Sequence, residues 1–143
     1  MSERRIRMSV VTPRGTLFEG LVEYLTLPSV EGIYGVLPGH APMVVALRPG
    51  VVHYGMAGRH GIAVGSGLCE ILQDRATVLA EGAYLPGQLD VAALREQHAA
   101  LAARIETGGS PEEIAQARQQ LQRVLALLEL DKEAPEGRRS SPL

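Results

Sequence analysis

The sequence predicts a mainly β protein with an α appendage: an N-terminal β-sandwich followed by a C-terminal antiparallel two-helix hairpin. Before Pro86-Gly87, apolar and polar residues alternate and turn residues recur at short intervals, which is typical of the strands of a sandwich or flattened barrel. After this point turn residues almost disappear and apolar residues recur three and four positions apart. We therefore predict a β-sandwich domain in residues 1–86, a helical hairpin in 87–130 and a disordered tail in 131–143.

The composition limits the class of protein. The 143 residues suit one domain, or a small domain with an appendage, and 45% are hydrophobic but only 3% aromatic, so the core must be aliphatic. A formal net charge of -2 argues against a nucleic-acid partner, which favours a basic surface. One cysteine excludes an internal disulfide. Because we find neither a signal peptide nor an apolar run long enough to span a bilayer, we expect a soluble chain.

The first half reads as short strands separated by turns. Ile6, Met8 and Val10 alternate with polar residues and predict a half-buried strand, and a turn follows at residues 12–15. Further strands are predicted at 17–18 and 21–27, the latter ended by Pro28, and two hairpins are predicted from 51–56 with 62–64 and from 68–72 with 76–80. The connections of these hairpins are residues 57–61 and 73–75.

The stretch from Glu31 to Pro42, closed by residues 47–50, concentrates glycine and proline. Glycine supplies backbone angles that other residues avoid, and proline fixes φ and removes a hydrogen-bond donor, so this stretch is neither a helix nor one long strand. We expect tight turns separated by short extended pieces at 33–36 and 43–47. A rigid loop of this kind either forms a corner of a β fold or presents a surface to a partner.

The second half predicts two helices. Asp90 is the expected N-cap of the first, and Thr107-Gly108-Gly109 ends it. Ser110 and Glu113 form a capping box around Pro111 at the start of the second. The apolar faces are Val91, Leu94, His98, Leu101 and Ile105 in the first helix, and Ile114, Ala117, Leu121, Val124 and Leu128 in the second. Because such alanine-rich helices bury little apolar area, we hypothesise that the hairpin can open or move.

The residues offer little support for catalysis. Cys69 lies within an apolar strand, where a buried small hydrophobe is the expected role, and the four histidines have no spacing typical of a metal site. Gly65-Ser66-Gly67 precedes a strand rather than a helix, so it predicts a bend and not a phosphate-binding loop. His40 can form either a hydrogen bond within its loop or a contact to a partner. The residues thus predict an interaction protein, with no catalytic residue, metal or cofactor.

A competing hypothesis from another class is a small β-sandwich hydrolase or binding module that uses Cys69 or His40. It predicts an activity of the isolated chain that alkylation destroys.

The order of motifs resembles the epsilon subunit family of the F-type ATP synthase. The similarity is carried by five segments and covers about residues 5–130, with the Leu-Pro-Gly-His-Ala-Pro core as its most specific part. The segments are Phe18-Glu19-Gly20-Leu21-Val22, the stretch from Glu31 to Pro42, Arg48-Pro49-Gly50, the run from Gly65 to Ile71, and Ala76-Thr77-Val78-Leu79-Ala80 followed by Leu89-Asp90.

The resemblance implies a non-catalytic subunit of the central rotor stalk. The sandwich would bind the gamma subunit and the c ring and couple ion flow to ATP synthesis, at the cytoplasmic side of the cell inner membrane. Its implied c-ring contacts are Glu31, Gly32, Ile33 and His40, and the position of Ile33 is often acidic in relatives. The hairpin would reach transiently into the alpha/beta catalytic head and inhibit ATP hydrolysis, with Arg118 and Arg123 facing an acidic loop of the beta subunit.

Some relatives bind ATP at the hairpin through an Ile/Leu-Asp-x-x-Arg-Ala pattern. Leu89-Asp90 fits the start of this pattern, which makes Asp90 a candidate nucleotide ligand, but Ala93 stands where the pattern has arginine. Arg95 is displaced to another side of the helix, at about 100° per residue. We therefore predict weak or absent ATP binding.

Overall fold

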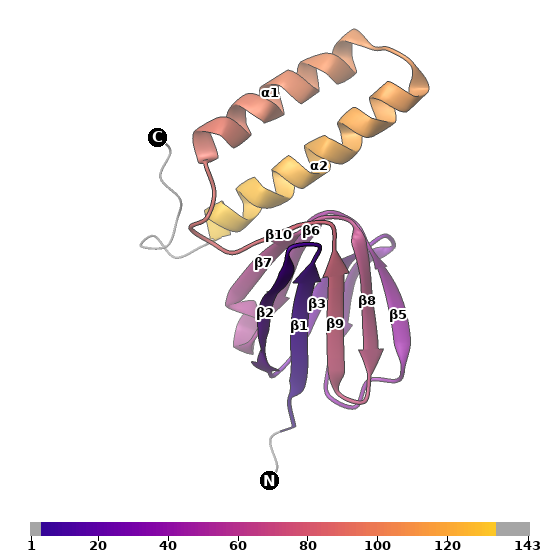
Figure 1. The fold of residues 1–143 in the computed structure, drawn as a ribbon, viewed down its shortest axis with the longest axis vertical. Helices are drawn as coiled ribbons and strands as arrows, with labels where there is room; N and C mark the ends of the chain where they lie inside the picture. Colours follow the sequence, from indigo (N-terminus) through magenta and orange to yellow (C-terminus); the bar gives the residue numbers. More distant parts are fainter. Residues whose placement is uncertain (1–3, 134–143) are drawn as a thin grey trace.

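The computed structural model describes residues 4–133, which form a β-sandwich and a helical hairpin (Figure 1). This confirms the predicted fold class. The strands are β1 (Ile6–Thr12), β2 (Gly15–Val22), β3 (Leu25–Ser29), β4 (Gly32–Val36), β5 (Met43–Leu47), β6 (Gly50–Tyr54), β7 (His60–Val64), β8 (Gly67–Leu72), β9 (Arg75–Ala80) and β10 (Ala83–Tyr84). The helices are α1 (Val91–Thr107) and α2 (Pro111–Glu133), and a 3-10 turn, η1, covers Met56–Gly58.

The ten described strands form one continuous sheet that folds back on itself. Its order is β10-β7-β6-β3-β5-β8-β9-β1-β2, and β4 pairs with β3 beside this path. The folded sheet has two layers, and the chain passes from one to the other at Arg48-Pro49. Before this point β5 pairs with β8, and after it β6 pairs with β7. Both β5 and β6 also pair with β3. β1 is parallel to β9, whereas the other pairs are antiparallel. The extended pieces predicted at 33–36 and 43–47 are confirmed as β4 and β5.

The sandwich core consists of aliphatic side chains from alternate strand positions. Ile6, Met8 and Val10 are buried while Arg7 and Ser9 are only partly so, which confirms the predicted alternation in β1. The remaining fully buried apolar residues include Leu25, Leu27, Val36, Val52, Ile62, Cys69, Ile71, Ala76 and Val78. A core of this kind stabilises the fold by removing apolar area from water, at about 25 cal/mol per Å².

Two predicted strand boundaries were wrong. The strand expected at 21–27 is broken after Val22, and β3 begins anew at Leu25. Pro28 does not end a strand but lies buried within β3, where its carbonyl accepts a hydrogen bond from the amide of Arg48 at 2.9 Å. Proline is tolerated there because its carbonyl forms this bond to the neighbouring segment and no amide is required of it.

The hairpin predicted from 51–56 and 62–64 is present, but its connection lies at residues 55–59, two positions earlier than predicted. β6 ends at Tyr54, the turn η1 follows, and β7 starts at His60. Ala57 takes a positive φ of 60° inside this turn, which sequence periodicity does not reveal. The short strand β10 was not predicted. The second hairpin is confirmed, but Arg75 belongs to β9, so only Gln73 and Asp74 form its turn.

The predicted helix caps are confirmed. The Asp90 carboxylate accepts a hydrogen bond from the amide of Ala93 at 3.1 Å, and α1 ends at Thr107. The Glu113 amide donates to Ser110 Oγ at 3.2 Å and the Ser110 amide to Glu113 Oε1 at 3.4 Å, which completes the capping box. Because α2 continues to Glu133, residues 131–133 are helical, which corrects the predicted start of the tail at residue 131. The remaining residues of that predicted tail, 134–143, lie outside the described part.

The hairpin rests on the sandwich through α2 (Figure 1). Its apolar residues form a second cluster with Val51 of β6 and Ala63 of β7, to which α2 contributes Val124, Leu127 and Leu130. α1 packs along α2 on the side away from the strands. In the described chain, neither helix combines the length with the apolar character that crossing a membrane requires.

Candidate functional site

The turn between β3 and β4 presents the first candidate surface. Ser29, which is buried, fastens the turn: its hydroxyl donates to the carbonyl of Gly32 and accepts from the amide of Glu31 at 3.2 Å. Gly32 has a φ of 127°, a left-handed conformation that favours glycine. Val30 and Glu31 therefore stand at the tip of a fixed turn, and both are exposed.

Three of the four predicted contact residues lie together on this turn. Glu31 and Gly32 form it and Ile33 follows in β4, with 68% of its side chain exposed. Val30 is 62% exposed beside them. The surface therefore has one carboxylate among apolar side chains, and Ile33 faces solvent with no packing role that would explain an isoleucine there.

His40 lies in the loop that follows β4, and both of its ring nitrogens have partners within the chain. Its Nε2 lies 2.7 Å from the hydroxyl of Tyr34, and its Nδ1 lies 2.6 Å from the carbonyl oxygen of Ala41. The imidazole is half-buried, and the ring of Tyr34 meets it edge-on with 5.5 Å between centroids. Of the two roles left open by the sequence, the structure has the hydrogen bond within the loop, so His40 shapes the loop from inside.

Asp74 fixes the same loop from a distant part of the sequence. Its Oδ1 accepts from the amide of Gly39 at 2.7 Å, and its Oδ2 forms an ion pair with Arg4 at 2.6 Å. The Gly39 bond, together with the Arg4 guanidinium, lowers the pKa of the Asp74 carboxyl below its ordinary value. Sequence reasoning treated Asp74 only as a turn residue, because its contact to Gly39 depends on how the strands are ordered.

Cys69 and His40 give the hydrolase hypothesis no support. The Cys69 thiol is fully buried, and burial, together with the neighbouring Glu70, raises its pKa to about 12. A thiol in this state is not a nucleophile at neutral pH. Across residues 4–133, no group of three or more histidine, cysteine, aspartate or glutamate side chains could hold a metal ion.

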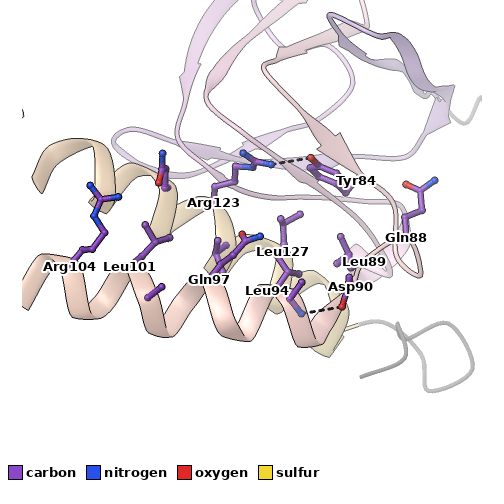
Figure 2. A pocket seen from close by; sticks show the side chains of 14 residues that line it. Tyr84, Gln88, Leu89, Asp90, Leu94, Gln97, Leu101, Arg104, Arg123 and Leu127 are labelled. Carbon is purple, nitrogen blue, oxygen red and sulfur yellow. Dashed lines mark hydrogen bonds between the residues drawn. The ribbon is translucent and has the colours of Figure 1, made fainter. Parts of the chain in front are cut away.

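A cleft of about 460 Å³ lies between the two helices and the segment that leads into α1 (Figure 2). Leucines of both helices form its floor, and glutamine and arginine side chains stand along it. Its lining residues are Tyr84, Gln88, Leu89, Asp90, Ala93, Leu94, Gln97, Ala100, Leu101, Arg104, Gln120, Arg123, Val124 and Leu127. Asp90 lines the cleft, but its carboxylate already caps α1, and the neighbouring Ala93 offers no charge.

The two arginines predicted to face the beta subunit are not equivalent. Arg123 turns toward the sandwich: its Nη2 donates to the hydroxyl of Tyr84 at 3.1 Å, and its guanidinium carbon lies 5.9 Å from the centre of that ring (Figure 2). Arg118 is exposed about 1.4 turns earlier, at about 140° around the helix. Gln119 adds a second polar link to the sandwich, through Ser66 Oγ at 3.2 Å. No pattern in the sequence predicted Tyr84 as a partner of Arg123.

The sequence of this chain matches a known protein family. Residues 5–86 match the family model described as ATP synthase, Delta/Epsilon chain, beta-sandwich domain. The ATP synthase epsilon chain of Koribacter versatilis is 35% identical over 101 residues, which are 70% of this chain and 71% of the relative. The ATP synthase epsilon chain 2 of Nitrobacter hamburgensis is 42% identical over 95 residues, 65% of this chain and 69% of the relative.

The fold also recurs in a solved structure. A chain in the cryo-EM structure of the Euglena gracilis mitochondrial ATP synthase, comprising OSCP, F1 and c-ring, aligns with a TM-score of 0.75 at 18% identity, over 87% of this chain and 80% of that one. Taken with the sequence matches, these findings confirm the resemblance carried by the motifs: the chain belongs to the delta/epsilon family of ATP synthase subunits, and the relatives it matches are bacterial epsilon chains.

Proposed function

We propose that this chain is a non-catalytic rotor subunit of an F-type ATP synthase, which binds the gamma subunit and the c ring and helps to couple ion flow to ATP synthesis. The observation that carries the proposal is the family match over residues 5–86, the whole sandwich, together with relatives named ATP synthase epsilon chain. The sandwich is suited to a docking role because hydrogen bonds within the chain fix two of its loops.

The proposed contact to the c ring is the β3–β4 turn, through Glu31, Gly32 and Ile33. Its support is the exposure of Glu31 and Ile33 on a turn that Ser29 holds rigid. A preformed surface loses little conformational freedom on binding, which favours a lasting contact during rotation. His40, the fourth proposed contact, also holds the loop that follows β4.

The proposed role of the hairpin is regulatory, as a unit separable from the sandwich near residue 87. Its link to the strands includes an apolar patch around Leu130 and two polar contacts, Arg123 to Tyr84 and Gln119 to Ser66. While the hairpin lies on the sandwich, the Arg123 side chain is bonded to Tyr84. An inhibitory contact of this arginine with the beta subunit therefore requires the hairpin to leave the sandwich. Arg118, which is exposed, can meet an acidic loop without such a movement.

The chain would reach the membrane only through its complex, at the cytoplasmic side of the inner membrane. Support for a peripheral position comes from the family and from helices too short or too polar to cross a bilayer within residues 4–133.

Co-expression with the gamma subunit of the same genome tests the proposal. A tagged full-length chain is expected to retain gamma through affinity and size-exclusion steps, and a chain ending at Gly87 is expected to retain it equally. The assembled complex should hydrolyse ATP faster with the shortened chain than with the full chain. Failure of the full chain to retain gamma contradicts the rotor assignment, whereas equal hydrolysis rates remove only the regulatory role.

A further inference from the structure

Strand β4 lies at an open edge of the sheet. Among the strands of residues 4–133 it pairs only with β3, so its other side has no neighbouring strand. Natural proteins commonly protect such an edge with lysine, proline or a bulge, because its unpaired backbone groups can bind another chain. The sequence of β4, Gly-Ile-Tyr-Gly-Val, has no charge and no proline, and its register with β3 is regular from Gly32 to Val36. This edge is therefore open to pairing.

The hydrogen bonds of β3 show which backbone groups of β4 are unpaired. The carbonyl of Pro28 accepts from the segment that precedes β6, and proline has no amide to donate to β4. Because successive residues of a strand direct their backbone groups to opposite sides, Leu27 directs its groups to β4 and bonds to Tyr34, its partner in the register. The amides and carbonyls of Ile33 and Gly35 then point away from β3. The open edge thus offers two donors and two acceptors.

The outer face of β4 carries one prominent side chain and one gap. Ile33 is 68% exposed. Gly35 lies two positions later on the same face, and no atom lies within 4 Å of the place where a Cβ would stand. A mainly apolar hollow of about 410 Å³ opens beside Gly35, lined also by Tyr24, Leu37 and the loop as far as His40. An exposed isoleucine and an apolar space without a side chain therefore lie two residues apart.

A second copy of the chain fits both features. When two β4 edges pair antiparallel about a twofold axis at Tyr34, Ile33 of each copy lies opposite Gly35 of the other. Both pairs are hydrogen-bonded ones, so the donors and acceptors of the two edges meet in four hydrogen bonds. Side chains that lie opposite one another share a face of the sheet, so each Ile33 reaches the hollow beside the other copy's glycine.

Charge does not oppose this pairing. The register places Glu31, the charged residue next to the strand, opposite Leu37 of the other copy, and the two Glu31 residues are six positions, or about 20 Å, apart along the pair. This separation exceeds the screening length of about 8 Å at physiological salt. Each copy has one β4 edge, so the assembly closes at two chains. Because one strand of five residues buries less than the area of about 1,200 Å² that a stable interface needs, the dimer is weak.

We propose that two copies of the free chain pair through their β4 edges in a weak antiparallel dimer. Pairing covers Ile33, so the dimer and the contact of the β3–β4 turn with the c ring exclude each other. This consequence rests on the proposed function, whereas the pairing itself does not. The dimer holds surplus chain in a form that joins the rotor only after it dissociates.

The oligomeric state of the full chain tests the pairing. In analytical ultracentrifugation the wild type is expected to shift from monomer toward dimer between about 10 µM and about 1 mM, the range of a weak interface. Ile33→Lys places a charge on each edge and should raise the dissociation constant at least tenfold. Leu125→Lys, at an exposed leucine of α2, should leave it within about twofold. A wild-type chain that is still monomeric at the highest concentration overturns the proposal, as do equal effects of the two substitutions.

Cysteine cross-linking tests the register. Tyr34→Cys places the two thiols opposite one another at the twofold axis, where the Cα atoms are about 4.5 Å apart, within reach of a disulfide. Oxidation should therefore link this variant into a covalent dimer. Leu37→Cys on the same edge places its thiols about 20 Å apart and should not cross-link. Cys69 is buried and does not contribute. Equal cross-linking of both variants contradicts the register.

If Tyr34→Cys fails to fold, hydrogen exchange of the wild type decides. Raising the protein concentration should slow exchange at the amides of Ile33 and Gly35 and leave the amides of β2, at the other end of the sheet, unchanged. Exchange at Ile33 and Gly35 that does not depend on concentration contradicts the pairing.

Assembly with gamma and the c ring separates this inference from the proposed function. The oxidised Tyr34→Cys dimer should be incorporated at least tenfold less than the same chain after reduction, and equal incorporation contradicts the exclusion of the c ring. A wild-type chain that is not incorporated at any concentration fails the proposed function, and the pairing is then judged by ultracentrifugation of the chain alone.

Discussion

The Asp74 carboxylate holds the backbone amide of Gly39 across thirty-five sequence positions, with 2.7 Å between Oδ1 and the amide nitrogen. Gly39 has a φ of 85°, so its amide is aimed by a backbone conformation that favours glycine. The same carboxylate pairs with Arg4, and the Asp74 carbonyl accepts from the amide of Arg7 at 2.9 Å. One turn residue thus joins the β8–β9 hairpin, the start of the chain and the loop after β4.

Asp74→Asn should loosen that loop without unfolding the sandwich. Asparagine tolerates the left-handed φ of 57° at this position, so the change removes mainly the charge. We expect faster hydrogen exchange at Gly39 and His40, with the melting temperature little changed. Gln73→Asn at the neighbouring turn position is the matched control, and faster exchange at Gly39 in the control as well would contradict a specific role of Asp74.

The hydrogen bond between Asp74 and the Gly39 amide should weaken as the pH falls. Because the folded state lowers the Asp74 pKa below 3.8, its ordinary value, the unfolded chain binds the proton more readily. The contribution of Asp74 to stability is complete above this ordinary value and is lost as the pH falls through the lowered one. The amide shift of Gly39 followed by NMR should therefore titrate below pH 3.8 in the wild type and show no such step in Asp74→Asn.

Arg123→Ala should favour release of the hairpin. The change removes one hydrogen bond and one cation–π contact to Tyr84, together worth about 1 kcal/mol at a solvent-exposed position, or about fivefold in the opening equilibrium. Limited proteolysis of the isolated chain within α2 should accelerate by that factor. Arg118→Ala on the same helix is the control and should leave proteolysis unchanged; acceleration by both would indicate a general effect on the helix.

The helical cleft should bind ATP weakly or not at all, because Ala93 supplies no positive charge beside Asp90. Calorimetric titration of the wild type is expected to show no micromolar affinity. Ala93→Arg, which supplies the arginine of the Ile/Leu-Asp-x-x-Arg-Ala pattern, should raise the affinity at least tenfold, since a hydrogen bond to a charged group is worth about 1.5–3 kcal/mol. Arg95→Ala, outside the cleft lining, should change nothing. Micromolar ATP binding by the wild type would refute this prediction.

Cys69 should resist alkylation in the folded chain. Its pKa of about 12, against an ordinary 9.0, leaves almost no thiolate at pH 8, and the side chain has no exposed surface. Iodoacetamide should label the chain only after unfolding in urea. The raised pKa also means that the stability associated with the neutral thiol is present below pH 9 and is lost as the pH rises toward 12. Rapid labelling of the native chain would revive the hydrolase hypothesis.

Local signals predicted the regular elements well and the long-range contacts poorly. The caps of Asp90 and Ser110 follow from residue types within four positions, so the sequence predicted both helix starts. The break after Val22 and the buried Pro28 depend on which strand lies alongside, which alternation alone does not reveal.

In the candidate site, too, local features were predicted and long-range contacts were missed. Glu31, Gly32 and Ile33 were found through the motif they belong to, and the rigid turn that presents them was expected from glycine content. Asp74 and Tyr84 were missed because each acts on a segment more than thirty residues away, and only the order of the strands brings the partners together. The hydrogen bond of His40 to Tyr34 is one of the two roles that the sequence left open for this residue.

The central claim is that this chain couples ion flow to ATP synthesis as a rotor subunit. The most direct measurement is ATP synthesis driven by an ion gradient in vesicles that contain the cognate ATP synthase assembled without this chain. Adding the purified chain is expected to restore gradient-driven synthesis. Synthesis that is already complete without the chain, or that stays absent after the wild-type chain is added, would contradict the account.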